Sequence, residues 1–141
     1  LVEGEYRAAE VVNHPMPRVI GQPPGDVERA LIMRAIETRR QVIVYEDDAT
    51  ESQAFSDHAH TFGITAEMAL PMVASDRVTG CMMWIETRVP RQFSDDDTRL
   101  AQTLTAQAAI AIENARLYRQ ARRQANCRTA GNYDGLETRL E

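Results

Sequence analysis

The chain has 141 residues, of which 43% are hydrophobic and 26% charged, and its net charge is −5. This size and composition predict one domain with a buried core. The acidic balance argues against nucleic-acid binding, and all 16 basic residues are Arg, which excludes lysine chemistry such as Schiff-base formation. No apolar run approaches the roughly 18–20 residues that cross a bilayer, and no signal peptide is visible.

In chain order, the first predicted elements are a strand, a loop and a helix. Residues 5–12 predict the strand. Four prolines within residues 13–25 exclude a helix there and indicate a loop. Asp26 is a suitable N-cap for a helix that reaches about Thr38. A β-branched strand over residues 41–45 follows.

The middle of the chain predicts a second helix and a hairpin. The helix covers residues 51–62, and Gly63 supplies its C-cap. Two strands follow, over residues 65–73 and 78–87. Ser75-Asp76 lie between these strands as a turn, so we expect them to pair as a hairpin.

A long helix is the clearest predicted element. Ser94 and Asp97 form a capping-box-like start, and no Gly or Pro occurs from there to about Asn126. At 1.5 Å per residue this helix would be about 50 Å long, which is more than one small domain needs. Residues 127–141 lack periodicity, so we expect a sensor domain over residues 1–126 and a linker or disordered tail over residues 127–141.

One face of the long helix repeats small and apolar residues at the four-three spacing of a heptad seam. The seam ends where Arg122 takes the next apolar position. We expect the seam to form a homodimer interface. The competing interpretation is that the same residues are buried against the sheet of their own chain. The seam consists of Leu104, Ala108, Ala111, Ala115 and Tyr118.

Two motifs carry a resemblance to a known family. They are Pro-Arg-Gln-Phe-Ser-Asp-Asp-Asp at residues 90–97 and Ala-Ile-Glu-Asn-Ala-Arg-Leu-Tyr at residues 111–118. With Leu-Pro-Met at residues 70–72 and Val-Thr-Gly-Cys-Met at residues 78–82, they make most of the chain resemble a GAF domain of a bacterial signalling protein. The resemblance implies an α+β fold, an α/β sandwich, in which a central antiparallel sheet has the long C-terminal helix on one face and a loop-and-helix lid on the other. It also implies that the first helix and first strand of the family lie upstream, so we expect the chain to be a fragment.

GAF domains bind small molecules between the sheet and its lid, which the resemblance places at residues 46–64. Strand alternation puts Met82, Trp84 and Glu86 on one face. We place that face toward the lid, because Trp84 and Glu86 carry polar groups and methionines with a tryptophan make an adaptable pocket. The alternative is that this face is simply core. The expected ligand-binding residues are Phe55, His58, Phe62, Met68, Leu70, Met82, Trp84 and Glu86.

The sequence does not identify the ligand or a cofactor. Cyclic-nucleotide-binding GAF domains carry an Asn-Lys pair where this chain has Glu86-Thr87, which argues against that ligand. Phytochrome-type members attach a bilin to a Cys beside a His, and neither Cys81 nor Cys127 has such a neighbour. For His58 and His60 the favoured interpretation is two solvent-exposed histidines, and the alternative is a haem ligand.

Catalysis is the less favoured class. A few GAF-fold proteins reduce methionine sulfoxide, which requires an attacking and a resolving cysteine. Here Cys81 falls in a predicted strand and Cys127 lies far away beyond the long helix. No closely spaced set of four ligands predicts a zinc site. We therefore expect no catalytic and no metal-binding residues, and two free thiols fit a reducing cytoplasm.

The sequence favours a cytoplasmic sensory or regulatory module of a multidomain signalling protein. We expect a small effector to shift the packing of the lid, and the long helix to carry that shift to an effector domain such as a histidine kinase or a cyclase. A ligand-free dimerisation spacer is the main alternative, and a thiol-dependent redox enzyme is the weaker one. Neither nucleic acid nor a membrane is an expected partner.

Overall fold

The computed structural model describes residues 22–48, 51–90 and 92–137, of which residues 126–137 are described by their backbone alone. The strand predicted over residues 5–12 lies outside the described residues. The remaining predicted helices and strands are confirmed, except for the end of the long helix. In chain order the elements are α1 (Asp26–Thr38), β1 (Val42–Tyr45), α2 (Gln53–Phe62), β2 (Ala66–Ala74), β3 (Arg77–Glu86) and α3 (Asp95–Glu137).

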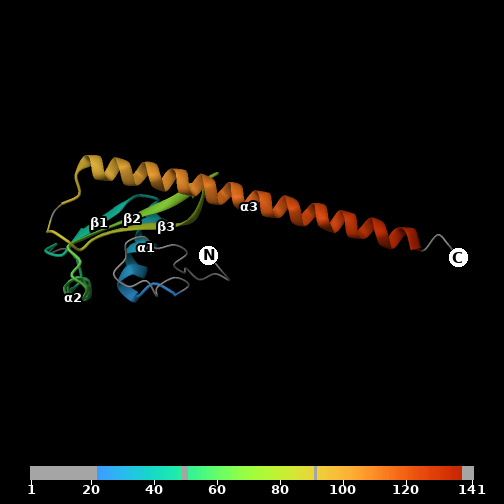
Figure 1. Cartoon of the computed structure of the whole chain (residues 1–141). Helices are drawn as coiled ribbons and strands as arrows, with labels where there is room; N and C mark the ends of the chain where they lie inside the picture. The colour runs from blue at the N-terminus through green and yellow to red at the C-terminus, as the bar shows by residue number, and fades with distance from the viewer. Residues whose placement is uncertain (1–21, 49–50, 91, 138–141) are drawn as a thin grey trace.

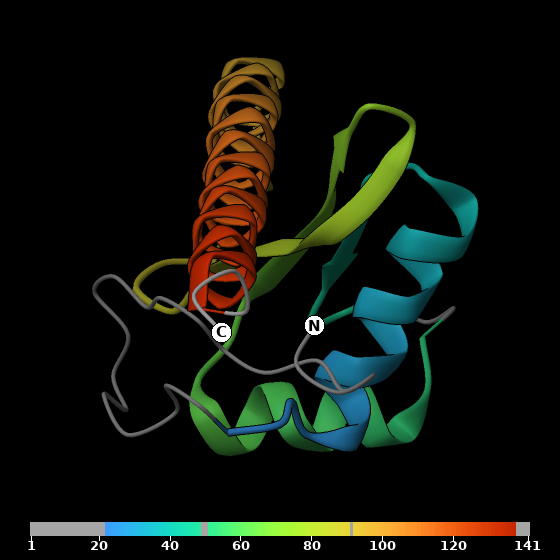
Figure 2. The ribbon, with the colours of Figure 1, turned by 90° about the vertical axis from the view of Figure 1, so that its right-hand side faces the viewer.

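The described part of the chain is built in three layers. Its strands form one antiparallel sheet in the order β1-β2-β3, with β2 in the middle. The long helix α3 lies over one face of the sheet, and α1 and α2 lie on the other side (Figure 1). Figure 2 looks along α3 and shows the sheet between this helix and the α1–α2 layer. The α+β sandwich implied by the resemblance is therefore confirmed.

The hairpin between β2 and β3 turns at Ser75 and Asp76, as predicted. Their φ angles are 48° and 62°, which belong to the type I′ turn whose twist matches that of the flanking strands. Arg39, at the end of α1, donates a hydrogen bond to the Asp76 carboxylate at 2.7 Å. This ion pair connects the end of α1 to the hairpin turn.

Pro71 lies in the central strand, where a residue without an N–H would normally interrupt the ladder. β1 pairs with β2 only as far as the Val42–Ala69 pair. Pro71 therefore lies beyond the end of β1 and pairs with Cys81 of β3 alone among the described strands. The proline is tolerated because one side of β2 has no described neighbour at this position.

The N-cap of α1 is Gly25 and not the predicted Asp26. The Gly25 carbonyl accepts a hydrogen bond from the Arg29 N–H at 2.8 Å, so helical hydrogen bonding starts one residue earlier than expected. Asp26 instead occupies the first turn, where a negative charge is favourable near the helix N-terminus. The predicted C-cap of α2 is confirmed, because Gly63 has a left-handed φ of 66°.

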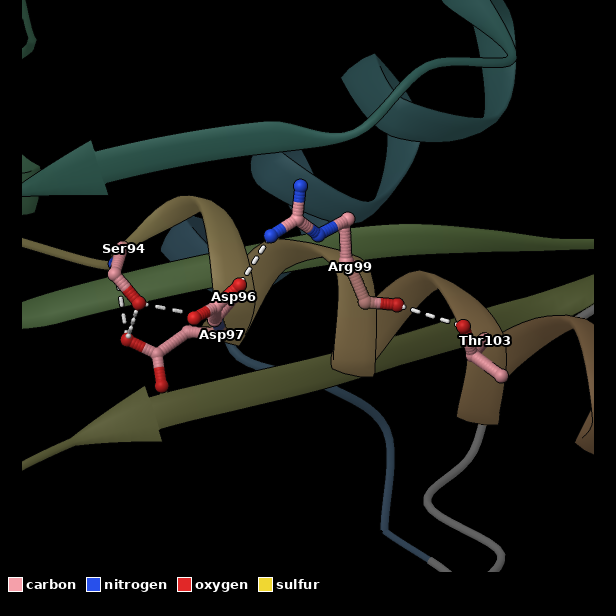
Figure 3. Close-up of polar contacts among 5 residues, drawn as sticks. All are labelled: Ser94, Asp96, Asp97, Arg99 and Thr103. Atoms are coloured by element: carbon pink, nitrogen blue, oxygen red, sulfur yellow. Dashed lines mark hydrogen bonds and ion pairs between the residues drawn. The ribbon is translucent and has the colours of Figure 1, made fainter.

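The start of α3 is the predicted capping box, drawn in Figure 3. The Ser94 N–H donates to Asp97 Oδ2 at 2.9 Å, and the Asp97 N–H donates to Ser94 Oγ at 3.1 Å. An ion pair between Arg99 and Asp96 follows on the next turn, and the Thr103 hydroxyl donates to the Arg99 carbonyl at 2.8 Å. Local side-chain hydrogen bonds therefore determine where this helix begins.

The helix α3 continues past its predicted end. It spans 43 residues and ends at Glu137, not near Asn126. Gly131 and Gly135 argued against a helix here, but each costs only about 1 kcal/mol relative to Ala and does not end it. Figure 1 shows the second half of α3 extending away from the sheet. The assignment of residues 127–141 as a linker stays a prediction, since a continuous helix also connects domains.

Candidate functional site

Two apolar clusters fill the interior, one on each face of the sheet. We call the space between the sheet and the α1–α2 layer the lid side, and the space between the sheet and α3 the α3 side. The buried residues of the lid side are Leu31, Ala35, Val44, Phe55, Ala59, Ile64 and Ala69, with Val27, Val42, Cys81 and Met83 packed against them. On the α3 side, Met68, Leu70 and Ala101 are buried, and Ile43, Trp84 and Phe93 pack against them.

The predicted ligand-binding residues are divided between these two sides. Three of them, Phe55, His58 and Phe62, belong to α2 in the lid layer. The strand residues face the other way, and Met82 Sδ accepts a hydrogen bond from the Thr105 hydroxyl of α3 at 3.4 Å. Our placement of that strand face toward the lid is therefore wrong. By contact or by strand alternation, the residues on the α3 side are Met68, Leu70, Met82, Trp84 and Glu86.

Side-chain volumes explain this orientation. The helix α3 turns the small residues Ala101 and Ala109 to the sheet, which leaves room for methionines and a tryptophan. The lid layer contributes Leu31 and Phe55, and the sheet meets them with smaller residues such as Ala69. Alternation determines which strand residues share a face, but the helices determine which face is covered by large side chains.

A polar cluster on the lid side was missed by the sequence reasoning. Glu67 of β2 is fully buried, with 0% of its surface exposed. Among the described residues, neither of its carboxylate oxygens has a hydrogen-bond partner. Glu28 of α1 is close enough to act on its charge, and His58 Nε2 lies 3.8 Å from Glu28 Oε1. We call Glu28, His58 and Glu67 the lid cluster.

The surroundings of Glu67 favour its neutral form. Burial, and then repulsion from Glu28, raise the pKa of Glu67 from 4.5 to about 7. Its cross-strand neighbours are Val44 and Ile85, which bring no compensating charge. Perturbed pKa values cluster at functional sites, so Glu67 is a candidate functional residue. The signal in the sequence was a single acidic residue in the otherwise apolar strand Ala66–Ala74.

The α2 side chains have different environments. Phe55 is 2% exposed and belongs to the core, whereas Phe62 is 43% exposed. The Phe62 ring packs on His58, with 4.8 Å between the ring centroids. The prediction of solvent-exposed histidines holds for His60 and is wrong for His58, whose Nε2 is buried. Of the predicted set, His58 is the residue that belongs to the lid cluster.

A groove of about 490 Å³ lies on the α3 side, where α3 passes the end of β2. Gln102 Nε2 donates to Gln41 Oε1 across it at 2.7 Å. Arg39 and Arg40 also line it, but Arg39 is already paired with Asp76. Leu70 is the one member of the predicted ligand-binding set in its lining. None of the lid-cluster residues lines it, so this groove is separate from the lid cluster.

The predicted seam is distinct from the buried face of α3. The helix residues buried against the sheet are Ala101, Thr105, Ala109 and Glu113. The alternative interpretation, in which the seam residues are buried against the sheet of their own chain, is therefore wrong. Pairing of two copies along the seam stays a prediction. Four seam residues, Leu104, Ala111, Ala115 and Tyr118, are exposed, and Ala108 is half-buried.

Glu113 ends the buried face of α3. Its carboxylate accepts two hydrogen bonds from Arg116, at 2.7 and 2.8 Å. These bonds and the charge of Arg116 hold the pKa of Glu113 below its ordinary value. Beyond Glu113, every described α3 side chain except that of Arg116 is exposed.

Cys81 lies half-buried on the lid side of β3. Burial raises the pKa of its thiol to about 11, so the reactive thiolate is scarce at neutral pH. We predict that, in a Cys127→Ser variant at pH 8, iodoacetamide modifies Cys81 about 100-fold more slowly in the folded protein than in urea. Mass spectrometry of timed samples measures both rates. Equal rates would contradict this environment and favour the thiol-enzyme alternative.

The described residues contain no group of three or more His, Cys, Asp and Glu side chains arranged to hold a metal ion. Within the same residues, no helix combines the length and the apolar composition that a membrane span requires, and this includes α3.

An antiparallel sheet with two short helices on one face and a long helix on the other defines the class of α+β sandwich domains. Comparison with known proteins identifies the family. A family model described as a GAF domain matches residues 2–113. The match covers well over half of the chain, so the chain belongs to the GAF domain family. GAF domains are generally regulatory sensory modules of signalling proteins and not enzymes.

Similar solved structures come from bacterial signalling proteins. A domain described as part of a two-component sensor histidine kinase from Sinorhizobium meliloti is 27% identical, with a TM-score of 0.53 over 59% of this chain. This chain spans 57% of the length of that domain. The PixJ GAF domain from Thermosynechococcus elongatus, solved in its blue-light-absorbing form, is 16% identical, with a TM-score of 0.62 over 81% of this chain and 69% of that one. A histidine kinase GAF domain from Bacillus halodurans is 21% identical, with a TM-score of 0.56 over 70% of this chain and 66% of that one.

Proposed function

We propose that this GAF domain senses a small effector on the lid side and passes the signal through α3 to an attached effector domain. The observation that carries this proposal is the course of α3. The helix packs on the sheet as far as Glu113 and then extends beyond it (Figure 1). A single element therefore both contacts the sheet and reaches outside it.

The central strand β2 supplies the connection between the two sides. Glu67 and Ala69 face the lid side, while Met68 and Leu70 face α3. Because protein interiors are close-packed, a displacement of β2 by a ligand on the lid side changes its contacts with α3. The expected result is a small shift of α3 relative to the sheet, which the protruding part of the helix carries outward.

The exposed seam supports signalling as a homodimer. Heptad spacing of small and apolar residues allows two helices to pack closely along their length. In the monomer Tyr118 is 64% exposed, which is a large apolar surface for a solvated helix. A second copy of α3 that pairs along the seam covers this surface.

We predict that Tyr118→Glu weakens the dimer by at least about tenfold in Kd, because the seam would then place like charges opposite each other. The helix itself is expected to persist, since Glu has a high helix propensity and Arg122 lies one turn away at 5.9 Å from the Tyr118 ring. Analytical ultracentrifugation of both proteins measures the monomer–dimer equilibrium.

Leu117→Glu is the matched control. Leu117 is 49% exposed and neighbours Tyr118, but it lies outside the heptad seam. Its replacement is expected to leave the equilibrium nearly unchanged. If wild-type protein is monomeric, or if both variants weaken the dimer equally, pairing along this seam is wrong.

A ligand-free dimerisation spacer is the second candidate, and the close packing of Phe55, Ala59 and Ala69 on the lid side favours it. Native mass spectrometry separates the two functions. A dimer that carries the extra mass of a small molecule supports the sensor, and a bare dimer supports the spacer. We further propose a cytoplasmic location, no catalysis by the domain itself, and a histidine kinase as the attached effector domain, with a cyclase as the alternative.

A further inference from the structure

Glu67 is a buried carboxyl group without a compensating partner among the described residues, which is rare in proteins. Its side chain is fully buried, and neither carboxylate oxygen has a hydrogen-bond partner in the described part of the chain. Burying a polar group without a partner costs a few kcal/mol, and burying an ionised one costs more. Such a group is generally kept because something outside the chain satisfies it, or because a proton neutralises it.

The groups around Glu67 indicate the charge of the missing partner. From the sheet, Val44 of β1 and Ile85 of β3 flank it, and both are apolar. From α1, the nearby charged group is Glu28, a second acid. On α2, the nearest such group to Glu28 is His58, whose buried Nε2 also lacks a hydrogen-bond partner and lies 3.8 Å from Glu28 Oε1. No described Arg compensates the two acids at this position.

A cationic nitrogen group satisfies all three members of the lid cluster. Its N–H groups donate to the Glu67 oxygens, and its charge removes the repulsion between Glu67 and Glu28. An imidazole nitrogen without a proton accepts an N–H, so His58 Nε2 can take a further hydrogen bond from such a group. An anion would be repelled by both acids, and a neutral amide would make the hydrogen bonds without the charge.

We propose that Glu67, together with Glu28 and His58, binds the cationic nitrogen of a small organic effector of the amine, amidine or guanidine class. This inference rests on the proposed sensory function and names the chemistry of its ligand. Because Glu67 has no exposed surface, binding requires α2 or α1 to move away from the sheet. That movement is the change that β2 and α3 then transmit.

Three compounds of nearly the same shape test the proposal. Benzamidine is a cation with N–H donors, benzamide is its neutral counterpart and benzoate is its anionic counterpart. At pH 8, isothermal titration calorimetry of the full chain is expected to give saturable benzamidine binding in the millimolar range or tighter. Benzamide should bind at least about tenfold more weakly, and benzoate should not bind.

Glu67→Gln keeps the size of the side chain and removes its charge, so benzamidine binding should weaken by at least about tenfold. Glu37→Gln, at an exposed position of the same α1 that carries Glu28, is the matched control and should bind as the wild type does. Lowering the pH below about 7 protonates Glu67 and should weaken benzamidine binding, although benzamidine remains a cation.

Three results would overturn the proposal: no benzamidine binding, equal binding of benzamide, or unchanged benzamidine binding by Glu67→Gln. Circular dichroism and urea unfolding of each variant exclude loss of the fold as the cause. These readouts are independent of the dimer measurements. If benzamidine fails to bind while native mass spectrometry finds another small molecule on the protein, the ligand class is wrong and the sensory function stands. If benzamidine fails to bind and native mass spectrometry finds a bare dimer, the sensory function fails in favour of the spacer.

Discussion

Replacing Glu67 by Gln is expected to stabilise the ligand-free protein by up to about 3 kcal/mol at pH 8 and to change its stability little at pH 4.5. The reason is the pKa of Glu67, which is about 7 in the folded protein against 4.5 for an ordinary Glu. A difference of this size corresponds to about 3 kcal/mol, at 1.36 kcal/mol for each pH unit. The variant lacks the ionisation that destabilises the fold.

The sign follows from proton binding. Between pH 4.5 and about 7 the folded protein holds a proton on Glu67 that the unfolded chain has lost. The contribution of this proton to stability is complete below pH 4.5 and is lost as the pH rises through 7. Urea unfolding at several pH values should therefore give a wild-type free energy of unfolding that falls across this window relative to that of Glu67→Gln. Parallel profiles for the two proteins would show that Glu67 is not buried in this way.

Glu37→Gln provides the control for this experiment too. Glu37 is an exposed acid on α1, so removing its charge should change the free energy of unfolding by no more than about 0.5 kcal/mol at any pH. Stabilisation of both variants at pH 8 would point to general charge repulsion in an acidic protein and would contradict a specific role for Glu67.

Phe55→Ala is expected to destabilise the protein by about 3–5 kcal/mol, which is typical for removing a buried Phe from a core. Phe55 is 2% exposed, belongs to the lid-side cluster, and is one of the largest fully buried side chains among the described residues. The loss can exceed half of the stability of an ordinary domain. Thermal and urea unfolding measure this effect directly.

Phe62→Ala is the matched control, because it makes the same change on the same helix. Phe62 is 43% exposed and contacts the His58 ring at the surface, so we expect a loss of less than about 1 kcal/mol. Similar losses for the two variants would contradict the orientation of α2. A large difference would show that Phe55 is a core residue. Its burial, and not contact with a ligand, would then explain its position on α2.

Local patterns were sufficient to predict the elements of this fold. The Ser94–Asp97 capping box, the Ser75-Asp76 turn and the Gly63 C-cap each depend on residues within a few positions of one another, and each was predicted correctly. The end of α3 was not predictable in this way. Glycines lower helix propensity, but their cost is spread over a long helix whose other residues favour it.

The candidate site was only partly predictable. His58 was identified from its position in the lid, whereas Glu67 was missed and the strand residues Met82 and Trp84 were placed on the wrong side. The period of a strand is two, so alternation sorts its residues into two sets with no information on direction. An error in direction therefore moves a whole set of side chains from one face to the other.

The sequence by itself determined the family, the hairpin turn, the spacing of the heptad seam, and the helices and strands of the described residues apart from the N-cap of α1 and the end of α3. These features depend on local spacing and on motifs. Only the tertiary structure decided which helix covers each face of the sheet and which face of α3 is buried. It also decided that Glu28 acts on the charge of Glu67 and lies 3.8 Å from His58, although the three residues are far apart in the chain. Their proximity depends on how two helices pack on a sheet, and packing is determined by the complementary volumes of the whole interior.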